Sequence, residues 1–290
     1  MSWYSDYKKS LKIIEVEDIL DLIFYRPIAF MLVKAVYNTR ITPNQLTFGS
    51  ILMGIAAGLC YSMGKPEYFT LGALFYMAFN VLDCSDGQLA RLKEKCTPHG
   101  RIIDGIADTI ATFAIYLGIG IGFANKSDHV LYWWIMLALA GLSNTVHGVL
   151  VDYYRSRFID YVKVKKSNFE ESLDKYKTEY ESIKDSKGKW FDRTILKFYL
   201  NYSGFQRRLT ANKKVSKPLN ASPEEYYKKN KLIMRFWMLL GPTSQITTLV
   251  ICSLFYRFDI FIWIMIFCFN GLALALWLIQ QLIERGLRKK

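Results

Sequence analysis

The stretch DCSDGQLARLKEKCTPHGRIIDGIAD, residues 83–108, places four aspartates between two long apolar segments. Asp83 follows the apolar run 71–82, and Asp108 precedes the apolar run 109–123. Carboxylates at the ends of membrane-length apolar segments are costly to place, and four of them repel one another unless positive charge lies between them. The stretch therefore indicates two transmembrane helices that meet at a functional cation site.

The spacing of the aspartates arranges them in pairs. Asp83 and Asp86 are three residues apart and Asp104 and Asp108 are four apart, so each pair shares one face of a helix. An all-oxygen site suits Mg²⁺ or Mn²⁺ and argues against zinc. Two such ions would neutralise a pyrophosphate, and a carboxylate that the metals do not need could accept a proton from an attacking hydroxyl. The alternative is a structural network of carboxylates with basic neighbours, namely Arg91, Lys93 and Arg101.

The composition of the 290-residue chain is typical of a membrane protein. The chain is 52% hydrophobic and carries a formal net charge of +13. These features segregate into apolar blocks and basic loops instead of alternating as in a soluble domain. The basic loops flank the apolar segments, so contact with anionic lipid headgroups explains them better than binding to nucleic acid.

The hydropathy pattern predicts an all-α, polytopic membrane protein with six transmembrane helices in a single domain, residues 1–290. The segment 1–43 is expected to lie along the membrane interface as an amphipathic helix, interrupted at Arg26-Pro27. A long polar segment, 159–231, is expected to form a cytoplasmic insertion. The expected spans are 44–63, 68–95, 101–124, 130–158, a fifth from about residue 232 that bends at Gly241-Pro242, and 260–284.

The distribution of basic residues orients the predicted helices. One set of connections, which includes the N-terminal segment, the loop 91–101, the segment 159–231 and the C-terminal tail, is rich in Lys and Arg. The opposite set contains only three such residues, Lys65, Lys126 and Arg257. By the positive-inside rule, both termini and the aspartate cluster face the cytoplasm, at the inner membrane if the protein is bacterial.

The polar residues of 83–108 also match a family signature. The pattern Asp83-x-x-Asp86-Gly87-x-x-Ala90-Arg91, eight residues, Gly100, three residues, Asp104, three residues and Asp108 resembles the signature of the CDP-alcohol phosphatidyltransferases at every position. Thr42-Pro43-Asn44, before the first span, is similar to that family too. The segment 159–231 is longer than the family's usual link between the fourth and fifth spans, so nothing is transferred to it.

The resemblance implies an enzyme that transfers a substituted phosphate from a CDP-linked donor to an alcohol and releases CMP. It implies that Asp83, Asp86 and Asp104 hold two divalent cations, Mg²⁺ or Mn²⁺, and that Asp108 is partly shared with the metals and acts as the catalytic base. It also implies a homodimer. The residues that it implies for the CDP site are Asn44, Asp83, Gly87, Ala90, Arg91 and Gly100.

The fourth expected span ends in a polar stripe through an apolar helix, formed by Asn144, Gly148, Asp152 and Arg155. We predict an acceptor site here in which arginines bind an alcohol that carries its own phosphate. With CDP-diacylglycerol as the donor, inositol phosphate or glycerol phosphate is then the favoured acceptor. The alternative is an interfacial helix end, where snorkelling Arg and Tyr are frequent. The predicted acceptor residues are Asp152, Arg155, Arg157 and Arg235.

Two other functions fit parts of the sequence. A choline or ethanolamine phosphotransferase would use CDP-choline or CDP-ethanolamine and diacylglycerol. A cation transporter or a non-catalytic binding scaffold would use the carboxylates without group transfer, but a transporter is expected to carry them near the bilayer midplane on broken helices. The aspartates here lie near predicted helix ends, which favours the enzyme.

Overall fold

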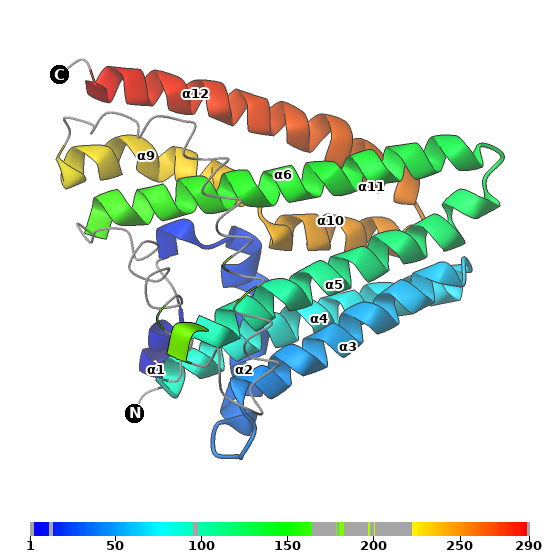
Figure 1. Ribbon diagram of the computed structural model, residues 1–290, viewed down its shortest axis with the longest axis horizontal. Helices are drawn as coiled ribbons and strands as arrows, with labels where there is room; N and C mark the ends of the chain where they lie inside the picture. The colour runs from blue at the N-terminus through cyan, green and yellow to red at the C-terminus, as the bar shows by residue number, and fades with distance from the viewer. Residues whose placement is uncertain are drawn as a thin grey trace.

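The computed structural model describes residues 3–11, 14–94, 98–163 and 222–288, together with a few positions between 178 and 200. Every secondary-structure element in this part of the chain is helical (Figure 1). Within it, five helical segments are long and apolar enough to cross a membrane. The structure therefore confirms an all-α, multi-pass membrane class, while the count of six spans stays a prediction.

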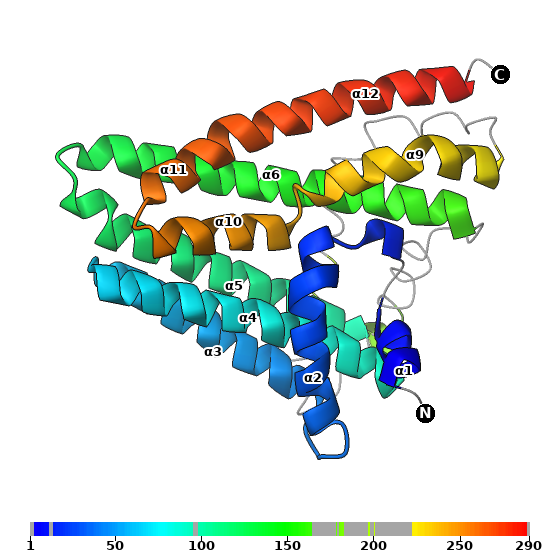
Figure 2. The ribbon, with the colours of Figure 1, turned by 180° about the vertical axis from the view of Figure 1, so that it is seen from behind.

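Three helices lie side by side in one layer (Figures 1 and 2). Their bounds are α3 (Pro43–Ser62), α4 (Pro66–Leu92) and α5 (Pro98–Gly122). α3 begins with a capping box, because the Thr42 hydroxyl accepts a hydrogen bond from the Gln45 N–H and the Gln45 side chain accepts one from the Thr42 N–H. α4, the second expected span, runs back along α3 and carries Asp83 and Asp86 toward its C-terminal end.

α3 and α5 approach each other closely through small residues. A Cβ atom added to Gly118 would lie 2.0 Å from the carbonyl oxygen of Gly58, and one added to Gly54 would lie 2.4 Å from the Cβ atom of Ala111. Small residues let membrane helices associate through direct backbone packing. This packing fixes the position of α5, and with it the aspartates near its N-terminal end, against α3.

The remaining helices form a second group. Their bounds are α6 (Val130–Lys163), α9 (Pro223–Met238), α10 (Pro242–Leu254), α11 (Phe258–Trp263), the π-helical η4 (Ile264–Phe269) and α12 (Asn270–Arg288). α9 and α10 are separated at Gly241-Pro242, as expected, and Pro242 begins α10, where its missing N–H costs nothing. Within the expected insertion, residues 159–163 continue α6 and 223–231 belong to α9; almost all of the rest lies outside the described residues.

The N-terminal segment is helical over most of its described length. It contains α1 (Trp3–Ser10), the short 3₁₀ turn η1 (Ile14–Val16), the π-helical η2 (Asp21–Tyr25) and α2 (Arg26–Val36). The expected interruption at Arg26-Pro27 is wrong, because the helix continues through it. The Arg26 N–H bonds the Asp21 carbonyl in a wider π turn, which accommodates the proline that follows. α2 then packs across α4 (Figure 2).

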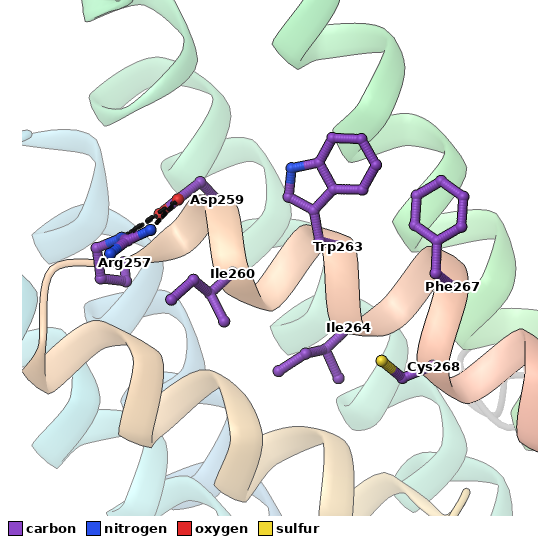
Figure 3. Close-up of a pocket in the computed structure, with 7 residues that line it drawn as sticks. All are labelled: Arg257, Asp259, Ile260, Trp263, Ile264, Phe267 and Cys268. Atoms are coloured by element: carbon purple, nitrogen blue, oxygen red, sulfur yellow. Dashed lines mark hydrogen bonds and ion pairs between the residues drawn. The ribbon is translucent and has the colours of Figure 1, made fainter.

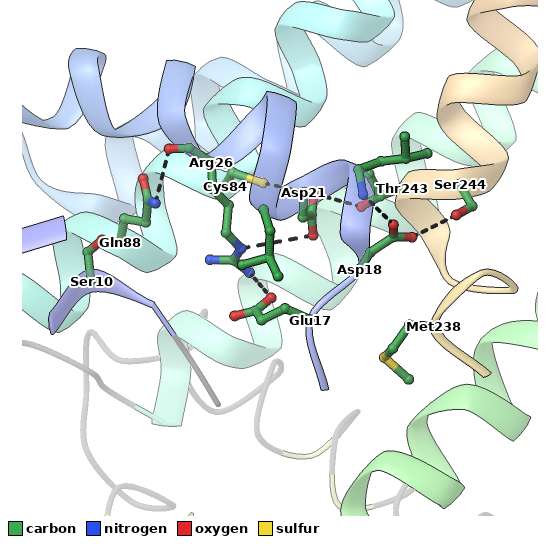
Figure 4. Close-up of polar contacts among 12 residues, drawn as sticks. Ser10, Glu17, Asp18, Asp21, Arg26, Cys84, Gln88, Met238, Thr243 and Ser244 are labelled. Carbon is green, nitrogen blue, oxygen red and sulfur yellow. Dashed lines mark hydrogen bonds and ion pairs between the residues drawn. The ribbon is translucent and has the colours of Figure 1, made fainter. Parts of the chain in front are cut away.

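Acidic residues of this segment face the protein. Ser244 Oγ donates to Asp18 Oδ2 over 2.7 Å, and Thr243 Oγ1 donates to Asp21 Oδ1 over 2.9 Å, both from the first turn of α10 (Figure 4). Burial raises the pKa of the Asp18 and Asp21 carboxyls above the usual aspartate value. The N-terminal segment is therefore held against α10 by buried side-chain hydrogen bonds.

Both chain ends lie at the same end of the helix bundle in the two views of the molecule (Figures 1 and 2). The C-terminal end of α4, the beginning of α5 and the end of α6 lie at that end too. This arrangement places the termini on the same side as the aspartates. That this side faces the cytoplasm stays a prediction.

Candidate active site

Three of the motif aspartates meet between α4 and α5. A carboxylate oxygen of Asp83, one of Asp86 and one of Asp104 all lie within 4.8 Å of one another. Asp83 Oδ1 and Asp104 Oδ1 are buried and have no hydrogen-bond donor in the described part of the chain. Buried acceptors without donors are costly, so this group is arranged for a positively charged ligand. Its oxygen-only donor set fits Mg²⁺ or Mn²⁺.

Asp108 lies one turn after Asp104 on α5 and lines the same cavity. Its side chain is exposed, whereas Asp86 is buried. The tight group of three aspartates does not include it. A carboxylate beside this group and exposed in the cavity is a candidate general base.

Thr47 on α3 positions one of the three aspartates. Its hydroxyl donates to Asp86 Oδ2, and both residues are buried. A donor on one oxygen orients the carboxylate and leaves its remaining lone pairs for a metal. Thr47 was not predicted as a site residue from the sequence; the signal that it offered was its position one turn after Asn44, near the start of a membrane helix.

The aspartates line a cavity of about 220 Å³. Its walls come from both helix groups and from the N-terminal segment. α4 and α5 supply the motif residues, while α6 supplies Arg155 and α10 supplies Thr243. The N-terminal segment supplies three charged residues, Glu17, Asp21 and Arg26. The cavity therefore combines the motif aspartates with the side chains of three arginines, Arg26, Arg91 and Arg155. Such a combination of charges is suited to phosphate chemistry.

A second hollow, of about 570 Å³, lies along α11 and η4 (Figure 3). Its lining is mostly apolar and includes Trp263 and Phe267. Its two charged residues satisfy each other, since Arg257 Nη2 lies 2.7 Å from Asp259 Oδ2. In Figure 1, α11 lies toward the end of the bundle away from the two termini. The described residues that line this hollow include no set of reactive groups comparable to those of the aspartate cavity.

Gly87 leaves open space beside Arg91. A Cβ atom added to Gly87 would lie 3.4 Å from Arg91 Nη1, an ordinary contact, so helix packing does not require glycine here. Arg91 Nε donates to the carbonyl of Ser10 at the end of α1, which holds the guanidinium on the cavity wall. The site thus presents an open surface at Gly87 and a fixed cation next to the aspartates.

The predicted acceptor residues do not all meet in the cavity. Arg155 lines it, and its buried Nε has no hydrogen-bond partner among the described residues. Arg157 Nη1 instead forms an ion pair with Glu284 Oε1 over 2.7 Å. Five other predicted residues are not among the described residues that line the cavity: Asn44 and Asp152 are exposed, and Ala90, Gly100 and Arg235 are partly buried. Their roles stay predictions.

The structure adds cavity residues that the sequence analysis did not identify. Asn80 lies on α4, one turn before Asp83, and its buried Nδ2 has no acceptor in the described part of the chain. Glu17, Asp21 and Arg26 come from a segment that was expected only to follow the membrane surface. A polar Asn80 at three-residue spacing from Asp83 was a readable signal; the inward direction of the N-terminal charges was not.

Comparison with known protein families agrees with this geometry. Residues 40–178 match the family model described as CDP-alcohol phosphatidyltransferase. The matched stretch contains α3, α4, α5, α6 and all residues of the aspartate motif. Just under half of the chain, residues 40–178, is therefore similar to the CDP-alcohol phosphatidyltransferases.

Curated relatives each match part of the chain. A bifunctional IPC transferase and DIPP synthase of Thermococcus kodakarensis is 29% identical over 119 residues, which cover 41% of this chain and 25% of that protein. A phosphatidylinositol phosphate synthase of Cutibacterium acnes is 28% identical over 135 residues, 45% of this chain and 58% of that protein. A ceramide phosphoethanolamine synthase of Drosophila melanogaster is 29% identical over 89 residues, 28% of this chain and 23% of that protein. The chain therefore matches less than two thirds of the length of each of these relatives.

Proposed function

We propose that this chain is a membrane phosphatidyltransferase that moves the phosphatidyl group of CDP-diacylglycerol to a hydroxyl of a polyol or polyol phosphate and releases CMP. One observation carries the proposal: three aspartate carboxylates within 4.8 Å of one another border a cavity that also contains Gly87, Arg91 and Asp108. The family match over the same residues and the phosphatidylinositol phosphate synthase among the relatives support it.

In the proposed reaction, the aspartates bind the metal ions, and Gly87 and Arg91 bind the CDP group of the donor. Asp83, Asp86 and Asp104, with Asp108 partly shared, would hold two divalent cations, which neutralise the diphosphate of the donor when bound. The open surface at Gly87 admits the CDP group, and Arg91 binds its phosphate oxygens.

Asp108 accepts the proton of the acceptor hydroxyl as its oxygen attacks the lipid-bearing phosphorus. A new P–O bond forms to the acceptor. The P–O bond to CMP breaks, and CMP takes the electron pair as the leaving group.

Arg155 supports an acceptor that carries a phosphate. Within the described part of the chain its buried Nε lacks a hydrogen-bond partner, and Nη2 makes a weak contact with the Met238 sulfur at 3.8 Å. A guanidinium without a carboxylate partner can accept a dianion without first breaking an ion pair. We therefore favour inositol phosphate or glycerol phosphate as acceptor. We also propose that the enzyme is a homodimer whose active site faces the cytoplasm.

A second candidate keeps the same motif but exchanges the roles of the substrates. The likeness to a ceramide phosphoethanolamine synthase favours a transfer in which the CDP-linked group is a head group and the acceptor is a lipid hydroxyl. The aspartates, Gly87 and Arg91 would act in the same way, since in both reactions they would bind the CDP half and the reacting phosphorus. Arg155 would then lack its proposed ligand.

The test is CMP release by the purified protein in detergent with Mg²⁺ or Mn²⁺. CDP-diacylglycerol is offered with inositol phosphate, glycerol phosphate, inositol or serine, one at a time, and CDP-choline and CDP-ethanolamine are offered with diacylglycerol. Release that depends on a polyol phosphate, and that is lost in Asp108→Asn, supports the proposal. In Arg155→Gln we expect the KM for that acceptor to rise at least tenfold, as for loss of a charged hydrogen bond. Release only with a CDP-linked head group would favour the second candidate, and no release at all would favour a binding or transport role.

A further inference from the structure

The wall of the cavity that α2 provides carries a buried arginine. Arg26 is 5% exposed, and its Nη2 lies 2.6 Å from Glu17 Oε2 (Figure 4). Its Nε lies 4.0 Å from Asp21 Oδ2, which is beyond hydrogen-bond distance. All three residues line the aspartate cavity. The guanidinium is thus fixed at one end of its fork by Glu17, in a residue that lines the cavity.

Two nitrogen atoms of the Arg26 guanidinium lack a hydrogen-bond acceptor among the described residues. Neither Nε nor Nη1 has a hydrogen-bond partner among the described residues, although both atoms are buried. Buried N–H groups of a guanidinium rarely stay without acceptors, because their desolvation is then uncompensated. The Arg26 main chain is anchored separately, since Gln88 Nε2 donates to the Arg26 carbonyl over 3.2 Å. The position of the guanidinium therefore does not depend on the atoms that lack acceptors.

Arg26 and Arg155 both line the cavity from helices outside the motif, but only Arg26 has a carboxylate partner among the described residues. Arg26 on α2 is neutralised by Glu17, which is itself 3% exposed, and has Asp21 nearby. Arg155 on α6 forms no ion pair in the described part of the chain. A paired guanidinium does not gain from binding a second anion, but it still donates to uncharged oxygens. Arg155 suits a phosphate, whereas Arg26 suits hydroxyl groups.

Arg26 and Arg155 lie on different helices from the residues that are expected to bind CDP. The motif residues expected to bind CDP and metal lie on α3, α4 and α5. Arg26, Arg155 and Thr243 line the cavity from α2, α6 and α10. A donor bound along the motif helices leaves this second set of side chains for the molecule that reacts with it.

We propose that Arg26, held by Glu17, is a specificity-determining residue that binds the hydroxyl-bearing part of a polyol acceptor while Arg155 binds the acceptor's phosphate. The inference rests on the proposed function, since it assumes that the acceptor enters this cavity. It assigns the N-terminal helix a part in substrate choice and makes a polyol phosphate a better substrate than an amino alcohol of the same size.

The test uses Arg26→Lys in the full-length enzyme. Lysine keeps the positive charge for Glu17 but replaces a planar fork of five donors by a single ammonium group. We expect the KM for the polyol phosphate to rise about tenfold or more, the loss of a hydrogen bond from a charged donor, with the KM for CDP-diacylglycerol unchanged. Acceptor analogues that lack one hydroxyl each provide the sharper readout. The wild type should discriminate against at least one analogue, and Arg26→Lys should discriminate against that analogue much less.

Two further variants keep the result interpretable. Lys34→Gln removes the ion pair of Lys34 with Asp6, which joins α2 to α1 without lining the cavity, and should leave both KM values unchanged. If Arg26→Lys does not fold, the pair Glu17→Gln with Arg26→Gln replaces both charges at once and avoids an unpaired buried ion. It should show the same loss of discrimination.

An Arg26→Lys enzyme with the wild-type KM and the wild-type preference among analogues would overturn this inference and leave the proposed function standing. So would an equal loss of kcat with every acceptor. A wild type that releases no CMP with any acceptor would overturn the proposed function, and this inference with it.

Discussion

Thr47 on α3 donates its hydroxyl hydrogen to the Oδ2 atom of Asp86 on α4, and both residues are buried. The bond joins the helix that precedes the motif to one of the three carboxylates that could hold a metal. Groups that hydrogen-bond a metal ligand fix its orientation and tune its basicity. The contact therefore gives α3 a role in the site beyond packing.

Thr47→Val tests this role, because valine has nearly the same shape but cannot donate. We expect the Mn²⁺ concentration for half-maximal CMP release to rise about 10- to 100-fold, the usual cost of losing such a bond to a metal ligand. Thr47→Ser keeps the hydroxyl and should stay close to the wild type. A Thr47→Val enzyme with an unchanged Mn²⁺ requirement would contradict a role for this bond in metal binding.

The sequence revealed the aspartates but not Thr47, for a physical reason. The face shared by Asp83 and Asp86 follows from helix geometry alone, and carboxylates at the ends of apolar segments have few structural explanations. The contact of Thr47 with Asp86 joins residues 39 positions apart on different helices. A threonine in a membrane helix more often bonds its own backbone, and Thr47 Oγ1 also lies 3.2 Å from the Pro43 carbonyl oxygen.

Two glycine substitutions should separate folding from activity. Gly118→Ala should lower the thermal stability, because its Cβ would lie 2.0 Å from the Gly58 carbonyl oxygen and would force α3 and α5 apart; overpacking of this kind costs about 1–3 kcal/mol. Gly87→Ala meets only an ordinary contact, 3.4 Å from Arg91, and alanine is the better helix former. It should therefore keep or raise the melting temperature.

Gly87→Ala should nevertheless lower CMP release at least tenfold, because the methyl group occupies the open surface beside Arg91 where the CDP group is expected to bind. The measurements are thermal melts in detergent and CMP release for both variants. The pattern expected is a stable, inactive Gly87→Ala and a destabilised Gly118→Ala. An active Gly87→Ala enzyme would exclude the open surface from substrate binding.

Removal of one carboxylate should have opposite effects with and without metal. In the metal-free protein Asp83, Asp86 and Asp104 lie within 4.8 Å of one another, and like charges at this distance repel. Asp104→Asn should therefore raise the melting temperature when metal is chelated. A bound ion stabilises the folded state by about 2.7 kcal/mol at a concentration 100 times its Kd, and Asp104→Asn should lose most of this gain.

Thermal melts with EDTA and with Mn²⁺ measure both effects in the same samples. Asp152→Asn, an exposed aspartate outside the three-carboxylate group, serves as the control for loss of one negative charge. If Mn²⁺ stabilises Asp104→Asn as much as the wild type, the three aspartates are not the metal site.

The helices and the N-terminal segment differ in how far sequence could describe them. Apolar runs of membrane length identify the long helices, and Gly241-Pro242 marks the break between α9 and α10, because both signals are local. The mixture of acidic and apolar residues around Asp18 and Asp21 predicts a helix with two faces, but it does not say whether water or protein covers the acidic face. The partners that cover it, Ser244 and Thr243, lie 226 and 222 positions away.

The buried acidic face also makes stability depend on pH in a defined direction. Burial raises the folded-state pKa of Asp18 above its ordinary value of 3.8, although the Ser244 hydroxyl and the Leu20 N–H donate to it. The folded protein then binds more protons than the unfolded chain, so the contribution of Asp18 to stability is greatest below the unfolded pKa and is lost as the pH rises through the folded pKa. Asp18→Asn stays neutral, so its stability relative to the wild type should increase as the pH rises from about 4.

Asp6 in the same segment should behave in the opposite way. A hydrogen bond from Lys34 lowers the pKa of the Asp6 carboxyl, so its contribution is present above the unfolded pKa and is lost as the pH falls. Asp6→Asn should therefore be less stable than the wild type near neutral pH and match it in acid. Melting temperatures of both variants at several pH values from about 3 to about 8 measure the two slopes, because the pKa of Asp6 lies below its ordinary value and that of Asp18 above it. Because the substitutions are chemically identical, slopes of the same sign would contradict the assignment of Asp18 to a buried environment and of Asp6 to an ion pair with Lys34.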